Sequence, residues 1–460
     1  MVATKAEAKT DQLRRLPSRA RFDVTRPRVG PAWRQYLRAI GPGLVTGASD
    51  DDPSGIATYA QTGAQYGLSL LWVALLTLPL MTAVQEICDR AAMATGLGLG
   101  ELANKRFGRL GRTVVAILLV ALLVANTMNI AADLVAIGSG MTLLRLGPTW
   151  SWALVAGVAI TTLLVLGTFD RIAVVFKLLC AALLAYLAVA VMVTHNWMSL
   201  LTHTFVPHIK FNRAYLGLLV AVLGTTISPY LFFWQGAHRL EEMRDEPEGG
   251  NSALPLRDQN DAGKAKRKQR TSRLDVFVGM TFSNLVMFAI IVSTSETLHA
   301  HGKTGVASAA QAAQALQPVA GHFASALFAV GFIGSGLLAV PVLAGAGSVG
   351  VAGLLKKRWG FSRSVRKAPL FYGLVAIGTV GGMALSLVHV NPIKLLVLVA
   401  VINGIAAGPF LILVMVITGN RKIMGAKYVN GRLAKTIGWS TTGLMVAAAV
   451  ALFATGGVSL

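Results

Sequence analysis

Long apolar runs recur along this sequence and restrict the folds open to it. From residue 39 to the end, stretches of about 18 or more residues carry few or no charges, and about 20 helical residues cross the ~30 Å hydrocarbon core of a bilayer. Charged residues make up only 13% of the chain, roughly half the share of a soluble domain. Because backbone polar groups in lipid must be bonded within their own segment, the runs are predicted to be helices.

We therefore predict an all-α integral membrane protein with about eleven transmembrane helices. The predicted spans are 39–66, 70–96, 113–142, 151–169, 172–194, 214–238, 273–298, 323–354, 369–388, 393–418 and 436–456. They form one transporter domain over 39–460, preceded by a basic tail over 1–38 that we expect to be disordered. The long polar stretch 241–272 is predicted to be a charged cytoplasmic loop.

The formal net charge of +22 reflects membrane topology. With the tail in the cytoplasm, 35 of the 42 Lys and Arg residues fall on that side, whereas five fall outside. This asymmetry follows the positive-inside rule and predicts a cytoplasmic N-terminus and an outside C-terminus, in the plasma (inner) membrane. Membrane lipid is the expected partner of these charges, and nucleic acid is not. No cleavable signal peptide is recognisable in the polar, arginine-rich tail.

Two of the predicted spans are interrupted by proline at corresponding places. The first contains Asp-Asp-Asp-Pro-Ser-Gly at 50–55, and the sixth contains Thr-Ile-Ser-Pro-Tyr at 226–230. Proline removes an amide donor and clashes with the preceding turn, so each helix should break near Pro53 and Pro229. Interrupted helices in corresponding halves of a chain indicate an inverted-repeat transporter with its binding site at the membrane midplane.

Asp52 is the leading candidate for a cation ligand. An ionisable side chain in mid-membrane is costly and indicates function, and a carboxylate beside unwound carbonyl groups suits a hard cation. The alternative is that Asp52 merely caps the half-helix that Pro53 begins. Capping requires one aspartate, whereas Asp50 and Asp51 add two more.

The sixth span offers hydroxyl groups opposite Asp52. Thr225, Thr226 and Ser228 are candidate metal ligands, although Ser and Thr in helices often bond to a carbonyl one turn earlier. Tyr230 is a candidate gate or pathway residue, with plain packing as the alternative.

Other buried polar residues are candidates for the transport pathway. Asp51 and Asp133 are ionisable groups of this kind, and Asp133 has no evident partner nearby in sequence. Asn403 is a further candidate, although intramembrane asparagines commonly join helices by hydrogen bonds. Cys88 and Cys180 lie in apolar runs and indicate neither a disulfide framework nor a cysteine metal site. No cofactor is expected.

The motifs resemble those of the Nramp family of divalent metal-ion transporters over nearly the whole predicted membrane domain. The matching segments are Gly41-Pro42-Gly43, Asp52-Pro53, Gly63-Ala64-Gln65-Tyr66-Gly67 with Leu71-Trp72, Thr95-Gly96 with Glu101-Leu102, Ala131-Ala132-Asp133-Leu134, Asn284, and Asn420 to Gly425. The resemblance implies a LeuT-like fold of two inverted five-helix repeats plus one extra helix. It also implies a metal ion held between helices 1 and 6.

The chain departs from the family pattern at its presumed ligands. Gly55 stands where the family carries asparagine, and Ser228-Pro229-Tyr230 replaces the usual Met-Pro-His. Ala136 replaces a glutamate of the family's proton pathway. The resemblance thus implies a metal site at Asp52, Gly55, Thr225, Thr226 and Ser228, without thioether sulfur.

These losses favour a hard ion. Thioether sulfur selects transition metals, so an all-oxygen site loses that bias, and a roomier site suits Mg²⁺, which keeps several waters. The pattern is similar to the Nramp-related Mg²⁺ transporter branch, which carries Mg²⁺ and Mn²⁺ without strict proton coupling. A related aluminium-transporting branch also alters these motifs.

We therefore expect a secondary transporter that imports Mg²⁺ and Mn²⁺ by alternating access. The leading alternative is a proton-coupled Mn²⁺/Fe²⁺ importer with a rearranged site, and a transporter of an organic solute is a third hypothesis. No nucleophile–base pattern indicates an enzyme. The oligomeric state stays open, with a monomer as the simplest expectation.

Overall fold

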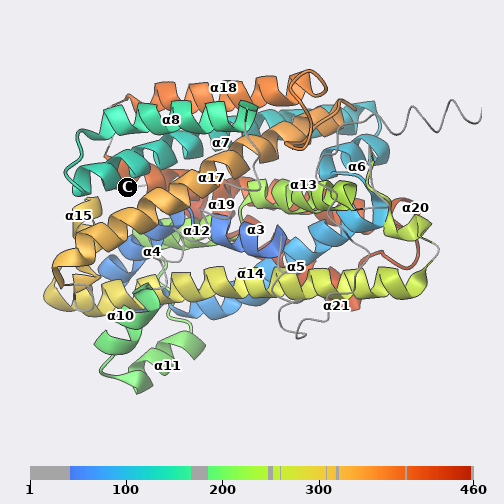
Figure 1. Ribbon diagram of the computed structural model, residues 1–460. Coiled ribbons are helices and arrows are strands. Elements are labelled where there is room, and N and C mark those ends of the chain that lie inside the picture. Colours follow the sequence, from blue (N-terminus) through green and yellow to red (C-terminus); the bar gives the residue numbers. More distant parts are fainter. Residues whose placement is uncertain are drawn as a thin grey trace, which may run out of the picture. The chain divides into compact units, whose positions relative to one another are not determined.

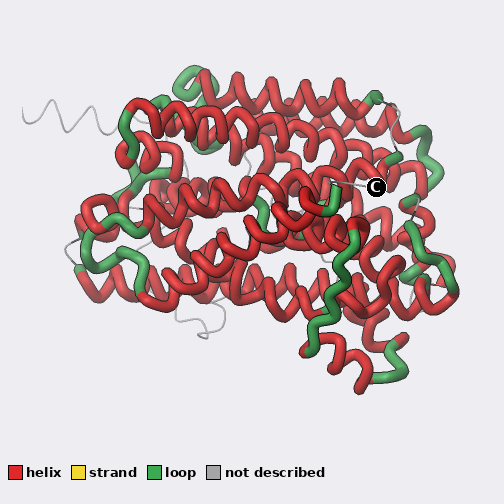
Figure 2. Tube along the Cα trace, turned by 180° about the vertical axis from the view of Figure 1, so that it is seen from behind, coloured by secondary structure: helices red, strands yellow, loops and turns green. Residues whose placement is uncertain are grey.

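The computed structural model describes residues 42–166, 185–246, 252–259, 261–306, 308–317, 321–388 and 391–456. Within these ranges every regular element is a helix, and Figure 2 shows only helices and loops. The predicted tail 1–38 and its boundary with the transporter domain at residue 39 lie outside the described residues. Cys180 and most of the predicted span 172–194 also lie outside them.

Eight helical segments are long and apolar enough to cross a membrane. They are Trp72–Thr95 (α5), Arg109–Leu143 (α7), Arg213–Asp245 (α12 and α13), Ala262–His301 (α14 with a short 3-10 turn), Ala324–Leu354 (α17), Pro369–Ser386 (α18), Pro392–Thr418 (α19) and Arg432–Ala454 (α21). These eight match predicted spans 2, 3, 6, 7, 8, 9, 10 and 11. A bent pair, Ala185–Val193 (α10) and Trp197–Phe205 (α11), is a ninth candidate, and the chain bends by 117° between its two helices.

The remaining predicted spans are shorter helices. Thr149–Leu166 (α8) corresponds to span 4, and span 1 consists of Pro42–Asp50 (α3) and Pro53–Tyr66 (α4). The helices run largely side by side in Figure 1. The short helices Leu99–Arg106 (α6) and Arg421–Met424 (α20) lie together at one end of this bundle, here called the α6 end. Ala309–Gln314 (α15) lies at the opposite end, here called the α15 end.

The first and sixth spans break where the prolines predict. Helix α3 ends at Asp50 and α4 begins at Pro53, which occupies the first helical turn. Arg213–Thr226 (α12) is likewise followed by Pro229–Asp245 (α13), again with proline at its start. Proline is tolerated there because the first turn needs no amide donor. Each break leaves two residues of unwound backbone inside the bundle.

Glycines allow the broken helices to pack closely on their neighbours. A Cβ at Gly47 of α3 would lie 2.1 Å from the carbonyl oxygen of Gly279 on α14, and one at Gly224 of α12 would lie 2.5 Å from Cα of Gly404 on α19. Small residues that bring backbones together are the usual means of helix association in membranes.

The stretch 241–272 is less of a loop than we expected. Its first residues complete α13, which ends at Asp245, and 262–272 form the first turns of α14. Between them, the side chains of Ala253 and Leu256 are buried. Gly96, with φ of +67°, lets the loop approach the end of α5, since a Cβ there would lie 2.8 Å from the carbonyl oxygen of Ala253. The polar composition therefore marks the helix ends and a packed connection between them.

Candidate cation site at the helix breaks

Asp52 lies at the break between α3 and α4 and is almost completely buried. Its Oδ1 accepts hydrogen bonds from the Gly55 amide at 2.8 Å and from the Ser54 hydroxyl at 2.6 Å. The Tyr230 hydroxyl, from α13, lies 3.4 Å from Oδ2 and 3.3 Å from the carbonyl oxygen of Ser49. Asp52 is therefore the cap of α4, while its second oxygen faces the other broken helix.

Asp50 and Asp51 are also fully buried beside the break. The Ser283 hydroxyl of α14 lies 2.6 Å from Asp50 Oδ2 and 3.3 Å from Asp51 Oδ1. In the described part of the chain, Asp50 Oδ1 and Asp51 Oδ2 have no hydrogen-bond partner. Buried carboxylate oxygens without partners are costly, so capping accounts for Asp52 alone and leaves these two aspartates unexplained.

The second break brings Thr225 to the first. A Cβ at Gly55 would lie 3.1 Å from Thr225 Oγ1 and 3.4 Å from the carbonyl oxygen of Asp50. Thr225 Oγ1 is buried and has no partner among the described residues. Gly55 therefore allows the two breaks to approach each other closely, with an unbonded hydroxyl and a carbonyl group beside it.

The hydroxyl groups of Thr226 and Ser228 donate to their own helix. Thr226 Oγ1 donates to the carbonyl oxygen of Val222, and Ser228 Oγ lies 2.6 Å from the carbonyl oxygen of Gly224 and 3.0 Å from that of Thr225. Their protons are engaged, which leaves them only lone pairs to offer. Of the three predicted hydroxyl ligands, Thr225 is the one whose hydroxyl is not already bonded.

The predicted pathway residues divide into two groups. Asp133, on α7, is fully buried, interacts electrostatically with Asp52, and has no described hydrogen-bond partner for either oxygen. Asn403, on α19, instead exchanges two 3.2 Å hydrogen bonds with Asn129 of α7. The structure thus places Asp133 near the aspartate cluster and gives Asn403 the helix-joining role that is common for asparagine.

Ser283 is a site residue that the sequence analysis did not identify. Serine is common in membrane helices, so its type alone gives no signal. The neighbouring Asn284 matches the family motif, but its amide donates to Thr77 Oγ1 at 3.0 Å. Only the packing of α14 against α3 shows that Ser283 faces two carboxylates.

The donor atoms at the breaks are oxygens of carboxylate, hydroxyl and carbonyl groups, which suit hard cations. Over the described ranges, no three His, Cys, Asp or Glu side chains are arranged to hold a metal ion together.

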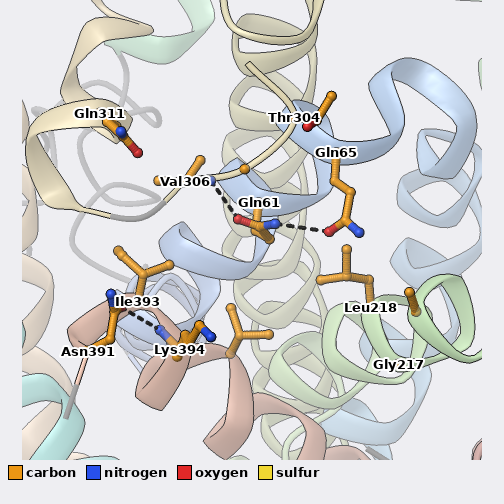
Figure 3. Close-up of a pocket in the computed structure, with 13 residues that line it drawn as sticks. Gln61, Gln65, Gly217, Leu218, Thr304, Val306, Gln311, Asn391, Ile393 and Lys394 are labelled. Atoms are coloured by element: carbon orange, nitrogen blue, oxygen red, sulfur yellow. Dashed lines mark hydrogen bonds between the residues drawn. The ribbon is translucent and has the colours of Figure 1, made fainter. Parts of the chain in front are cut away.

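A cavity of about 440 Å³ lies at the α15 end. Figure 3 shows Gln61 and Gln65 of α4 facing it, and Gln61 accepts a 2.8 Å hydrogen bond from the amide of Val306 and donates one of 2.9 Å to Gln65. Gln61 follows Asp52 by nine residues, or roughly 13 Å along a helix. The lining includes one charged side chain, Lys394. Asp52 itself is only 1% exposed, so it is closed off from this cavity.

A buried charged network lies on the other side of the breaks, where α3, α5, α13 and α14 meet. Arg239 Nε lies 2.8 Å from Asp89 Oδ1, and Arg239 Nη2 lies 3.1 Å from Asp275 Oδ2. Asp275 also accepts a 2.8 Å bond from the amide of Gly43 in α3. Gln235 bonds to Asp89 at 3.0 Å and to Thr46 at 2.5 Å. This network, the Arg239 network, joins both broken helices to α5 and α14.

Comparisons with known proteins agree with this arrangement. The family model described as natural resistance-associated macrophage protein-like (Nramp) matches residues 43–455. The divalent metal cation transporter MntH of Ralstonia nicotianae is 29% identical over 441 residues, which cover 92% of each chain. MntH of Klebsiella pneumoniae is 26% identical over 417 residues, covering 89% of this chain and 92% of that protein.

Solved structures show the same fold. A manganese transporter of Eremococcus coleocola superimposes with a TM-score of 0.70 at 17% identity, over 93% of this chain and 88% of that one. The structure of MhsT in complex with L-phenylalanine gives a TM-score of 0.56 at 13% identity, over 90% and 98% of the two chains. The predicted all-α, LeuT-like membrane fold is confirmed. The chain belongs to the Nramp family, and it is a divalent metal cation transporter rather than an enzyme.

Proposed function

We propose that this protein carries Mg²⁺ and Mn²⁺ across the membrane, with the ion bound between the two helix breaks. The observation that supports this most directly is the meeting of the two breaks. The buried Asp52 carboxylate lies 3.4 Å from the Tyr230 hydroxyl of the second broken helix, and Gly55 of the first approaches the unbonded Thr225 hydroxyl. Thr226 and Ser228 contribute oxygen lone pairs, and retained water completes the shell.

The ion preference follows from these donors. Sulfur ligands favour softer transition metals, and the residues at the breaks supply oxygen instead. Mg²⁺ gives up its water reluctantly and is commonly bound by one or two carboxylates together with water. Gly55 lacks the amide side chain that the family pattern places there, so water takes the place of that ligand in the proposed shell.

Alternating access is the proposed route. The cavity at the α15 end would admit a hydrated ion, and the Arg239 network would close the opposite side in this conformation. Breaking and re-forming contacts of α3 and α13 would then expose the ion to the α6 end. Under the proposed topology the α6 end is cytoplasmic, so this direction is import.

We infer that transport does not require strict proton coupling, because tyrosine and alanine occupy positions 230 and 136, where the resemblance implies proton-carrying groups. A proton-coupled Mn²⁺ importer is the second candidate. Buried Asp50, Asp51 and Asp133 favour it, since they are carboxylates that could carry protons. The names of the MntH relatives and of the manganese transporter agree with Mn²⁺ as an ion.

Ion flux into liposomes tests both candidates. We expect the purified protein to admit Mg²⁺ and Mn²⁺ without a matching fall in internal pH. Asp52→Asn should abolish flux, whereas Asp258→Asn, at an exposed aspartate in the connection before α14, should not. Mn²⁺ flux with acidification and without Mg²⁺ flux would support the second candidate instead. Full activity of the Asp52→Asn variant would show that the transported ion does not bind at Asp52.

A further inference from the structure

A second cavity, of about 450 Å³, opens at the α6 end, away from the helix breaks. Its charged lining residues are Arg244, Lys356, Lys357, Arg358, Arg363 and Glu101. Five of these six carry positive charge. They come from the end of α13, the segment after α17, and α6, so the cavity is built by parts of the chain that are far apart in sequence.

Arg244 is held in a fixed position beside this cavity. Its guanidinium lies 4.3 Å from the ring centre of Trp359, and Nη1 donates to the Trp359 carbonyl oxygen at 3.4 Å. Trp359 is buried. Arg244 Nε is buried without an acceptor among the residues that the structure describes. A planar guanidinium is the side chain best suited to bind an anion through two oxygens, and Nε of this one is still unused.

The nearby carboxylates already have other partners. Glu101 Oε2 accepts a 2.8 Å bond from the amide of Gly98, and Glu241 Oε1 accepts one of 3.3 Å from the amide of Ser362. Glu101, Glu241 and Asp245 all attract Arg244 electrostatically. They offset part of the positive charge, but Glu101 is the one carboxylate in the cavity lining, against five cations.

The backbone after α17 carries its lysines into the cavity wall in an unusual conformation. Lys356 has φ of +56°, a left-handed conformation that usually falls to glycine at the end of a helix. Its amide bonds to the carbonyl oxygen of Gly353 at 3.0 Å, and that of Lys357 bonds to the carbonyl oxygen of Ala352 at 2.8 Å. Two backbone hydrogen bonds therefore fix the turn from which these lysine side chains start.

We propose that this cavity binds a phosphate group. Several cations around one hollow repel one another unless an anion lies between them, and phosphate combines multiple charge with oxygens placed for guanidinium and ammonium donors. The phosphate can belong to an anionic lipid headgroup at the membrane surface or to a soluble phosphate compound. A ligand here bridges Arg244, on the same half-helix as Tyr230, and the lysines after α17.

Thermal unfolding of the full-length protein in neutral detergent micelles tests the proposal. The probes are inorganic phosphate and short-chain phosphatidic acid, with short-chain phosphatidylcholine and sodium chloride of equal ionic strength as controls. We expect a saturable increase in Tm with a phosphate-bearing probe. An increase with phosphatidic acid alone identifies a lipid headgroup, and an increase with inorganic phosphate as well identifies a soluble ligand.

Matched variants locate the effect. Lys357→Gln should weaken the apparent affinity about tenfold, because it removes one charge-assisted contact. Arg366→Gln removes the same charge from an exposed position in the same connection, outside the cavity lining, and should leave the affinity unchanged. Arg244→Lys keeps a charge but loses the paired donors, so it should also bind more weakly. An absence of any Tm increase, or an equal increase in all variants, would overturn the proposal.

Discussion

At the scale of single residues, the two carboxylate oxygens of Asp52 have different surroundings. Its Oδ1 accepts the Gly55 amide and so caps α4, whereas Oδ2 faces Tyr230 on the other broken helix. A carboxylate has lone pairs for both tasks. Capping and cation binding are therefore compatible interpretations of one residue. Thr225 gives a clearer test, because its hydroxyl has no hydrogen-bond partner among the described residues and so no structural role of its own.

Replacement of Thr225 tests the ligand set. Its Oγ1 is buried without a described partner, so Thr225→Val should leave thermal stability unchanged or raise it slightly. If the hydroxyl contacts the ion, the same variant should raise the KM for Mg²⁺ influx about tenfold, and Thr225→Ser should restore it. An unchanged KM in Thr225→Val liposomes would exclude a ligand role.

At the scale of elements, helix breaks and close helix contacts determine the positions of the candidate site residues. Pro53 and Pro229 begin α4 and α13. The two breaks lie close together, because Gly55 approaches Thr225 and the Tyr230 hydroxyl lies 3.4 Å from Asp52. Each half-helix is then fixed by a neighbour: α3 by α14 at Gly47, and α12 by α19 at Gly224. The site therefore depends on contacts between helix backbones as well as on side chains.

Two glycines of α12 provide a matched test of that dependence. A Cβ at Gly224 would lie 2.2 Å from the carbonyl oxygen of Ala400, so Gly224→Ala should destabilise the protein by about 1–3 kcal/mol and impair transport. A Cβ at Gly217 would meet its nearest neighbour at 4.0 Å, so Gly217→Ala should be neutral or slightly stabilising. Thermal unfolding and Mg²⁺ influx measure both effects. Equal stability of the two variants would contradict the close contact.

At the scale of the whole molecule, the two ends of the bundle differ in charge. The α6 end carries the basic cavity and the connections that precede α14 and α18, whereas the cavity at the α15 end includes a single lysine. This distribution is what the positive-inside rule requires of a cytoplasmic α6 end. The membrane orientation is a prediction that thiol labelling can test.

Single cysteines at exposed positions report the orientation. In a background with Cys180→Ser, Lys303→Cys should react with a membrane-impermeant thiol reagent added to intact cells, because it is exposed at the α15 end. Lys266→Cys, exposed near the start of α14, should react only after the membrane is permeabilised. Cys88 is buried and should stay unlabelled in both cases. Labelling of position 266 in intact cells would reverse the proposed topology.

The helical membrane class and the positions of both breaks could be predicted from sequence, and so could the burial of a carboxylate at Asp52. These features depend on local chemistry: apolar runs must be helices in lipid, and proline interrupts a helix wherever it stands. A buried carboxylate is conspicuous in any apolar run.

The pairing of polar groups, in contrast, became visible only in the packed helices. The tertiary structure paired Ser283 with two aspartates, Asn403 with Asn129, and Arg239 with Asp89 and Asp275. It also showed that Thr226 and Ser228 bond within their own helix while Thr225 does not. The reason is that hydroxyl and amide groups can bond equally well within a helix or across to another one. The packing of the helices, and not the residue type, settles that choice.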